Sequence, residues 1–418
     1  MDKASIIEIL STIRKRTLSI IQPFSEESLV NKYNELMGPV AWDLQHCAEI
    51  EALWTTRIDL KTKDCIDDTG MVPAFFDAFQ TPRRMRDPKG QLRLDWVLAR
   101  MAEVRQNSLR ILSDFNPDDS YPLAKNYFLW KMIAQHEAWH AETMIVAINM
   151  LPDEAWEGVD LPSAAWNDSV PSKVDDSEMV EVKGGDWVMG TSNYGFPYDN
   201  EMPAHIVNTP TFLIDRFPVS NRRYFDYLDK TNAKPPFGWE RTSNGWVKKW
   251  FGKKIPVDPD CPVLGVSYDE AVLFAKFIGK RLPTDAEWEK AASWNPQEGQ
   301  KRTYPWGEAP PSNTTCNING NVGGGPSRIG SLPEGRSFYG CEHMLGDCWE
   351  WVEESLYLYD GFQPWPYFGF TMPFVGKDKI LRGGSWALAA PLTRNTLRNW
   401  DMPIRKQIFT GIRCARSY

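Results

Sequence analysis

The chain has few of the features that mark secreted or membrane-bound proteins. No apolar run approaches the roughly 18 residues that a membrane-spanning helix needs. The first residues also lack the basic, then apolar, then small-residue order of a signal peptide. The seven cysteines are scattered, and no two have C-x-x-C spacing. We therefore expect no disulfide framework, and a reducing cytoplasm is the expected location.

Acidic residues outnumber basic ones. Lys and Arg number 47 against 55 Asp and Glu, which gives a formal net charge of −8. Nucleic acids and anionic membranes bind basic surfaces, so we expect neither as a partner.

Two kinds of sequence meet along the chain. Residues up to about 150 carry apolar side chains at helical spacing, which predicts an up-down bundle of four long helices. These helices are expected near residues 6–21, 40–54, 94–112 and 124–150. The residues that follow are rich in Pro, Asp and Ser, as in a linker.

From residue 179 the sequence changes to short segments punctuated by Gly, Pro and Trp. This pattern predicts a loop-rich domain with two short helices, near residues 221–228 and 268–279. The whole chain is therefore predicted to be an α+β protein. Its expected parts are a helical bundle at 1–152, a linker at 153–178 and the loop-rich domain at 179–418.

Only five histidines occur, and two of them, His136 and His140, stand four residues apart in a strongly helical segment. Residues at this spacing lie on one helix face, so their imidazoles can share one divalent metal. The same residues read H-E-x-x-H, the zinc-protease motif in which Glu137 is the general base. The downstream H-x-x-G-x-x-H extension of that motif is absent. A zinc hydrolase nevertheless remains an alternative.

A third histidine, His46, lies within a predicted helix of the bundle. An antiparallel neighbour could place it opposite His136 and His140, giving a three-histidine site with open positions. A core or surface histidine with no ligand role is the competing interpretation. Glu142 follows His140 by two residues, about 200° round the helix. We therefore expect it to support the structure rather than to bind the metal.

Several stretches together resemble a known family. Residues 136–142 resemble the H-x-x-x-H-x-E iron motif of the sulfoxide synthases that make ergothioneine and ovothiol, and residues 42–46 resemble the helix that supplies their first histidine. The second half resembles the formylglycine-generating, sulfatase-modifying-factor domain. The matching stretches are residues 183–185 with 189–190, 281–289, 304–307, 345–351 and 381–386.

The resemblance implies a DinB-like four-helix bundle followed by a C-type-lectin-like domain, with an active site between the two. It also implies iron(II) as the cofactor, and dioxygen, a thiol and hercynine (N-α-trimethylhistidine) as small-molecule substrates. The product would be a sulfoxide with a new carbon–sulfur bond. The ergothioneine branch fits best, with γ-glutamylcysteine or cysteine as the thiol.

The same resemblance implies roles for individual residues. His46, His136 and His140 would bind the metal, and Arg83 and Arg86 would hold the carboxylates of the thiol substrate. Tyr367 lies where the family places a catalytic tyrosine beside the dioxygen. Hercynine would be bound by the segment that contains Asn399, Trp400 and Asp401.

The chain departs from the family pattern at two positions near the expected imidazole site. Trp139 replaces a polar glutamine, and Phe370 replaces a second tyrosine. Both changes remove hydrogen-bonding groups, which leaves a selenoneine synthase as an alternative. Residues 386–390 read W-A-L-A-A, without the cysteine pair of the formylglycine-generating enzymes. A non-catalytic lectin-like binding module is the remaining alternative.

Overall fold

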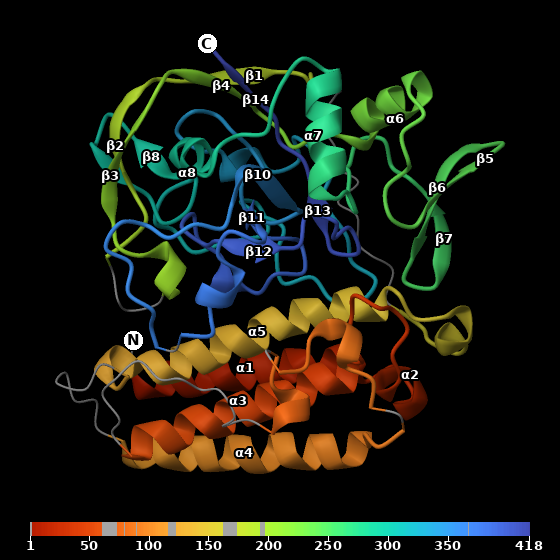
Figure 1. Cartoon of the computed structure of the whole chain (residues 1–418), viewed down its shortest axis with the longest axis vertical. Helices are drawn as coiled ribbons and strands as arrows, with labels where there is room; N and C mark the ends of the chain where they lie inside the picture. The colour runs from red at the N-terminus through yellow and green to blue at the C-terminus, as the bar shows by residue number, and fades with distance from the viewer. Residues whose placement is uncertain are drawn as a thin grey trace. The chain divides into compact units, whose positions relative to one another are not determined.

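A computed structural model describes residues 2–60, 73–78, 80–88, 90–115, 123–161, 174–192, 197–366 and 368–418 (Figure 1). Contacts within the chain divide it into two units. The helical unit comprises Met1–Leu161, Asn193–Phe196 and Pro364–Pro373. The sheet-rich unit comprises Pro162–Ser192, Pro197–Gln363 and Phe374–Tyr418. This arrangement of a helical part and a sheet-rich part confirms the predicted α+β class.

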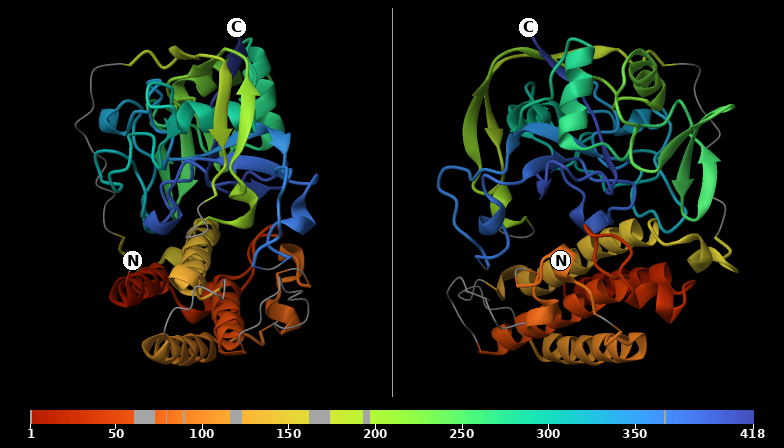
Figure 2. Two further views of the ribbon diagram at one scale, coloured as in Figure 1. Left: turned by 90° about the vertical axis from the view of Figure 1, so that its left-hand side faces the viewer. Right: turned by 45° about the vertical axis from the view of Figure 1, so that its right-hand side comes forward.

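The helical unit contains, among the described residues, the four long helices that the sequence predicts. They are α1 (Lys3–Ile21), α3 (Val40–Leu60), α4 (Leu94–Asp114) and α5 (Phe128–Ile148), and they lie side by side in both views of Figure 2. The shorter elements are α2 (Glu26–Val30) and the 3-10 turns η1 (Ala74–Phe76), η2 (Arg83–Met85), η3 (Lys125–Tyr127) and η4 (Asp153–Trp156).

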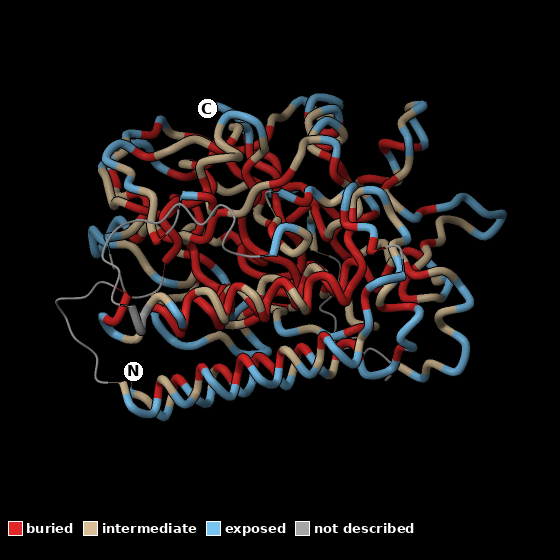
Figure 3. Tube along the Cα trace, turned by 60° about the horizontal axis from the view of Figure 1, so that its bottom comes forward, coloured by how far each residue is buried: buried red, intermediate tan, exposed pale blue. Residues whose placement is uncertain are grey.

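Helix α5 is the most fully buried of the long helices of this unit. It packs against α1 and α3, and α3 in turn packs against α4. Nearly all of its residues are buried, whereas α4 buries one stripe that includes Val97, Met101 and Val104. Figure 3 shows such a pattern along the helix at the lower edge of the view, where buried and exposed residues alternate. The buried residues of α5 include charged and polar ones, so several of its polar side chains need partners inside the protein.

Helix α5 begins at Phe128 rather than near residue 124 as predicted. Asn126 and Tyr127 adopt positive φ angles of 51° and 58°, which interrupt the helical backbone immediately before it. Helix α1 begins with a side-chain cap. The carboxylate of Asp2 accepts a hydrogen bond from the backbone N–H of Ser5.

The sheet-rich unit is built from several small sheets. One has the strand order β12 (Asn399–Asp401), β11 (Lys379–Arg382), β10 (Trp349–Ser355) and β13 (Thr410–Gly411). Another has the order β1 (Met179–Val182), β4 (Phe212–Asp215) and β14 (Ala415–Ser417). The remaining strands pair in further small sheets. In these sheets β2 (Gly185–Met189) pairs with β3 (His205–Thr209), and β8 (Trp294–Asn295) pairs with β9 (Gln300–Lys301). A three-stranded sheet has the order β5 (Trp239–Thr242), β6 (Gly245–Trp250) and β7 (Lys253–Pro256).

Helices α6 (Asn221–Lys230) and α7 (Tyr268–Phe277) match the two short helices that the sequence predicts. A further helix, α8 (Asp285–Ser293), was not predicted. It begins at a capping box, in which Thr284 accepts from the backbone N–H of Glu287 and Glu287 accepts from that of Thr284. The core of the unit contains Trp288 from α8 with Val352 and Ile380 from the central strands.

Candidate metal centre

Helix α5 carries two of the predicted ligands on one face. His136 and His140 are separated by one helical turn, and their ring centroids lie 4.6 Å apart. The residues of α5 that are only partly buried are His136, Trp139, His140 and Thr143, which form a single stripe along the helix. The histidine face is therefore the least covered face of this helix.

Helix α3 brings the third histidine to the same place. The ring of His46 lies 5.0 Å from that of His136 and 4.7 Å from that of His140, centroid to centroid. One potential ligand atom from each of the three lies within 4.8 Å of those of the other two. Among the described residues, these three form the one group of His, Cys, Asp or Glu side chains with that spacing.

Hydrogen bonds fix which nitrogen of two of these rings faces the site. The Nδ1 of His46 donates to the backbone carbonyl of Phe76 over 2.7 Å, and the Nδ1 of His140 donates to the carboxylate of Asp43 over 2.8 Å. Since a carbonyl and a carboxylate only accept, both Nδ1 atoms carry the proton. The Nε2 lone pairs of both rings are therefore left for a metal.

Burial keeps two of the histidines neutral. It lowers the pKa of His46 well below its ordinary value, and the neighbouring His140 and His136 lower it further. Burial and His140 likewise lower the pKa of His136. Neutral imidazoles offer lone pairs to a cation. The donor set therefore fits a divalent transition metal and leaves positions open for other ligands.

Asp43 was not predicted from the sequence. It is completely buried and lies on α3 one turn before His46, so a single helix supplies both a candidate ligand and the carboxylate that orients His140. The i, i+3 spacing of Asp43 and His46 was the available signal. Carboxylates commonly orient metal-bound histidines in this way.

Trp42 and Arg86 form layers over His46. The indole of Trp42 stacks on His46 with centroids 5.0 Å apart and an interplanar angle of 12°. The guanidinium of Arg86 lies 3.6 Å from the centroid of the same indole. The η1 turn supports this arrangement, because the carbonyls of Phe75 and Phe76 accept from Trp42 and His46 respectively. Arg86 therefore contacts the same indole as the candidate metal ligand His46.

Arg83 and Trp139 were also predicted to contact substrate. Arg83 is partly buried in η2, three residues before Arg86. Trp139 lies on the histidine stripe of α5, where the departure from the family pattern places a large apolar ring.

The two acidic residues of the α5 motif, Glu137 and Glu142, do not belong to the group of three histidines. Both oxygens of Glu137 are in ion pairs with Arg14 and Arg105. Glu142 is buried too. Burial lowers the pKa of Arg16 to about 10, and the negative charge of Glu142 opposes this shift. Glu137 therefore does not have the free carboxylate that a general base needs.

The remaining predicted residues belong to other parts of the chain than α3 and α5. Phe370 belongs to the helical unit and packs on its apolar core. Asn399, Trp400 and Asp401 form β12 of the sheet-rich unit, where Trp400 lies 5.4 Å from Phe374, ring centroid to centroid. Tyr367 lies outside the described residues.

Comparison with known proteins assigns the family. A model of the DinB superfamily matches residues 9–144, and a model of the sulfatase-modifying factor enzyme 1-like domain matches residues 166–418. A hercynine oxygenase from Mycolicibacterium smegmatis is 35% identical over 99% of this chain and 99% of its own length. A hercynine oxygenase from Mycobacterium tuberculosis is 35% identical, over 97% of each chain. The chain belongs to the hercynine oxygenase family.

Membership of the hercynine oxygenase family makes this chain an oxidoreductase and confirms the family that its motifs resemble. It also confirms the predicted pairing of a DinB-like bundle with a C-type-lectin-like domain. The second part has a further relative, a formylglycine-generating enzyme from Thermomonospora curvata, which is 29% identical over 57% of this chain and 92% of its own length. Within the described residues, no helix is both long and apolar enough to cross a membrane.

The Asp43–His140 contact leads to a first prediction. Asp43→Asn keeps the size of the side chain but removes the charge that stabilises the Nδ1 proton of His140. We expect metal affinity to fall about 10–100-fold, the usual cost of losing an outer partner of a metal ligand. Anaerobic titration with iron(II) measures the change. The control is Glu49→Gln on the same helix, whose carboxylate pairs instead with Arg100. Equal affinities in wild type and Asp43→Asn would contradict this assignment.

Proposed function

We propose that the protein is an iron(II)- and dioxygen-dependent sulfoxide synthase that joins hercynine to a cysteine-containing thiol in ergothioneine biosynthesis. One observation carries the proposal: three converging histidines lie in a chain that is 35% identical, over 99% of its length, to a protein named hercynine oxygenase. Imidazole is a suitable ligand for iron. The group of three leaves positions open for substrates.

The proposed reaction balances with one molecule of dioxygen. The imidazole ring of hercynine loses a C–H hydrogen, the thiol loses its S–H hydrogen, and a carbon–sulfur bond forms. One oxygen atom is transferred to sulfur, and the other leaves as water with the two hydrogens. The substrates supply four electrons, two for the new bond and two for the sulfoxide, and dioxygen accepts all four.

Bound iron(II) would supply electrons to dioxygen and lower the pKa of the thiol substrate. The chain itself would hold the ion through Nε2 of His46 and His140 and through a ring nitrogen of His136. Asp43 and the carbonyl of Phe76 keep two of these rings oriented. Three neutral ligands leave the full charge of the ion to attract a thiolate.

Arg83 and Arg86 are proposed to bind the carboxylates of the thiol. A guanidinium donates two parallel hydrogen bonds to a carboxylate, which fixes the direction of the bound substrate. The position of Arg86 supports this role, because its guanidinium stacks on the indole that stacks on His46. Arg86 is itself held in place, because its Nε donates to the carbonyl of Thr81 over 3.0 Å.

The hercynine side of the site is proposed from the family motif. Asn399 and Asp401 would orient the amino-acid part, and the face of Trp400 would attract the trimethylammonium group by about 0.5–2 kcal/mol. Tyr367 would donate a proton or hydrogen bond to reduced oxygen. Trp139 would form an apolar wall beside the imidazole of hercynine, because it lies on the same stripe of α5 as His136 and His140.

A donor panel tests the substrate assignment. Protein loaded with iron(II) receives hercynine and oxygen with γ-glutamylcysteine, cysteine or a selenosugar. We expect a sulfoxide from one of the two thiols, detected by mass spectrometry and absent when hercynine, iron or oxygen is omitted. Turnover only with the selenosugar would instead assign a selenoneine synthase. No product from any donor would contradict the proposal and favour a binding role.

The ion pairs of Glu137 disfavour the zinc hydrolase alternative. It requires Glu137 to accept a proton from water, but both oxygens of this carboxylate are held by Arg14 and Arg105. Burial raises the pKa of Glu137, and the two arginines outweigh that effect and lower it below its ordinary value. A carboxylate so stabilised is a weak base.

A further inference from the structure

Glu137 stands between the two histidines of α5 in sequence but is at the centre of a separate buried cluster. The Nε of Arg14, from α1, lies 2.7 Å from one of its oxygens. The Nη2 atoms of Arg14 and Arg105 lie 3.2 Å and 2.7 Å from the other. Arg105 comes from α4. The helix that carries two of the candidate ligands is thus tied to two of its neighbours through the residue directly after His136.

Glu51 completes the cluster from α3. The Nε and Nη2 of Arg105 lie 2.7 Å and 3.1 Å from its two oxygens, and the Nη2 of Arg14 lies 3.1 Å from one of them. All four side chains are buried. Two arginines and two glutamates balance in charge, so each buried ion has partners of the opposite sign.

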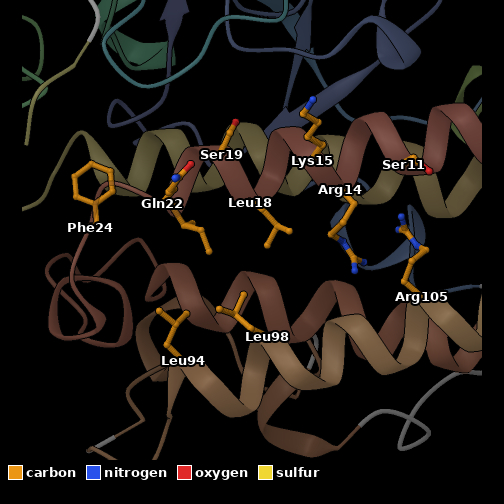
Figure 4. Close-up of a pocket in the computed structure, with 11 residues that line it drawn as sticks. Ser11, Arg14, Lys15, Leu18, Ser19, Gln22, Phe24, Leu94, Leu98 and Arg105 are labelled. Atoms are coloured by element: carbon orange, nitrogen blue, oxygen red, sulfur yellow. The ribbon is translucent and has the colours of Figure 1, made fainter.

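Each arginine is fixed at its far end as well. The Nη1 of Arg14 donates to the carbonyl of Met101 on α4 over 2.8 Å, and the Nη1 of Arg105 donates to the carbonyl of Leu10 on α1 over 2.6 Å. Figure 4 shows both side chains pointing into the space between α1 and α4, at one end of a pocket of about 750 Å³. The guanidiniums therefore have a fixed position from which to hold the carboxylates.

The cluster links the two helices that carry the candidate ligands. Glu51 lies on α3 five residues after His46, and Glu137 lies on α5 directly after His136. Arg105 donates to both glutamates through one guanidinium. A rotation of α5 that moved Glu137 would also move His136 and His140. Displacements of about 1 Å are enough to disrupt a preorganised site.

We propose that Glu137 and Glu51, clamped by Arg14 and Arg105, are positioning residues for the metal. They set the spacing and rotation of α3 and α5, and so keep His46 within ligand distance of His136 and His140. This inference rests on the proposed metal site. The glutamate of the H-E-x-x-H sequence thus acts through helix placement rather than through proton transfer.

Cobalt(II) binding by the intact chain tests the inference without using activity. We expect Glu137→Gln to bind cobalt(II) at least about tenfold more weakly than wild type, with an altered visible absorption spectrum. Arg105→Lys should show a smaller loss, because lysine keeps the charge but cannot fork between two carboxylates. The control is Arg100→Gln, which removes an α3–α4 ion pair with Glu49 that does not involve α5. It should bind cobalt(II) as wild type does.

The outcomes separate this inference from the proposed function. Folded Glu137→Gln, verified by circular dichroism at the titration temperature, with wild-type affinity and spectrum would overturn the positioning role alone, provided that His136→Ala loses the metal. If wild type binds no cobalt(II), or His136→Ala binds it normally, both proposals fall. If Glu137→Gln does not fold, Arg105→Lys decides by the same two readouts.

Discussion

Replacement of His46 by alanine is expected to lower iron(II) affinity by more than about 100-fold. Loss of an outer partner of a ligand alone costs about 10–100-fold, and this change removes a proposed ligand itself. The remaining pair, His136 and His140, comes from a single helix and leaves an open side on the ion. Anaerobic titration, followed by metal analysis after gel filtration, measures the effect.

The matched control is His205→Ala. His205 is a partly buried histidine of β3 in the sheet-rich unit, and its Nδ1 contacts the carbonyl of Pro203. It should bind iron(II) as wild type does. His46→Ala protein with undiminished iron affinity would show that the three-histidine site is wrong, whatever its catalytic activity.

Replacement of Arg382 by methionine is expected to have the largest effect on stability. Arg382 is completely buried; its Nε lies 2.5 Å from Asp285 and its Nη2 lies 2.6 Å from Glu289. Its Nη1 donates to the carbonyls of residues 395, 396 and 397. Removal of one partner from such a buried group costs about 3–5 kcal/mol. We expect the unfolding free energy of the sheet-rich unit to fall by about that amount.

Urea unfolding followed by tryptophan fluorescence measures the change. Arg241→Met is the control, because Arg241 forms an exposed ion pair with Asp229. Exposed pairs contribute about 0–1 kcal/mol. A loss in Arg382→Met as small as that of the control would contradict the structural role assigned to this cluster.

The Arg382 cluster also explains why two of the sequence motifs occur together. Asp285 and Glu289 belong to the stretch 281–289, and Arg382 belongs to the stretch 381–386. Their side chains meet in the interior of the sheet-rich unit. The residues of these motifs therefore hold α8 against β11, and we assign them no catalytic role.

Local patterns in the sequence predicted the helices of the bundle but not their directions. The predicted up-down order is wrong, because α3 and α4 run parallel: Glu49 pairs with Arg100, and Glu51 pairs with Arg105 farther along both helices. Apolar spacing predicted the four long helices, because a helix in a bundle must bury one face. The capping box of Thr284 and Glu287 was also visible in the sequence, but α8 is short and was not predicted from it. The start of α5 depends on the positive φ angles of Asn126 and Tyr127, which no spacing rule indicates.

Contacts between distant residues were less accessible from the sequence. The convergence of His46 with His136 and His140 was anticipated from an antiparallel bundle, and the structure brings these side chains together. Their role as ligands stays a prediction. The partners of Glu137 lie 123 and 32 residues away, on α1 and α4. Only the folded bundle shows that this glutamate faces arginines rather than the metal.

Isotopic analysis of the product tests the central claim most directly. Iron(II)-loaded protein reacts with hercynine and γ-glutamylcysteine or cysteine under ¹⁸O₂, and the product is analysed by mass spectrometry. We predict one compound that contains both substrates, less two hydrogens, with a single ¹⁸O atom on sulfur. Formation of only the oxidised thiol, or a coupled product without ¹⁸O, would contradict the account.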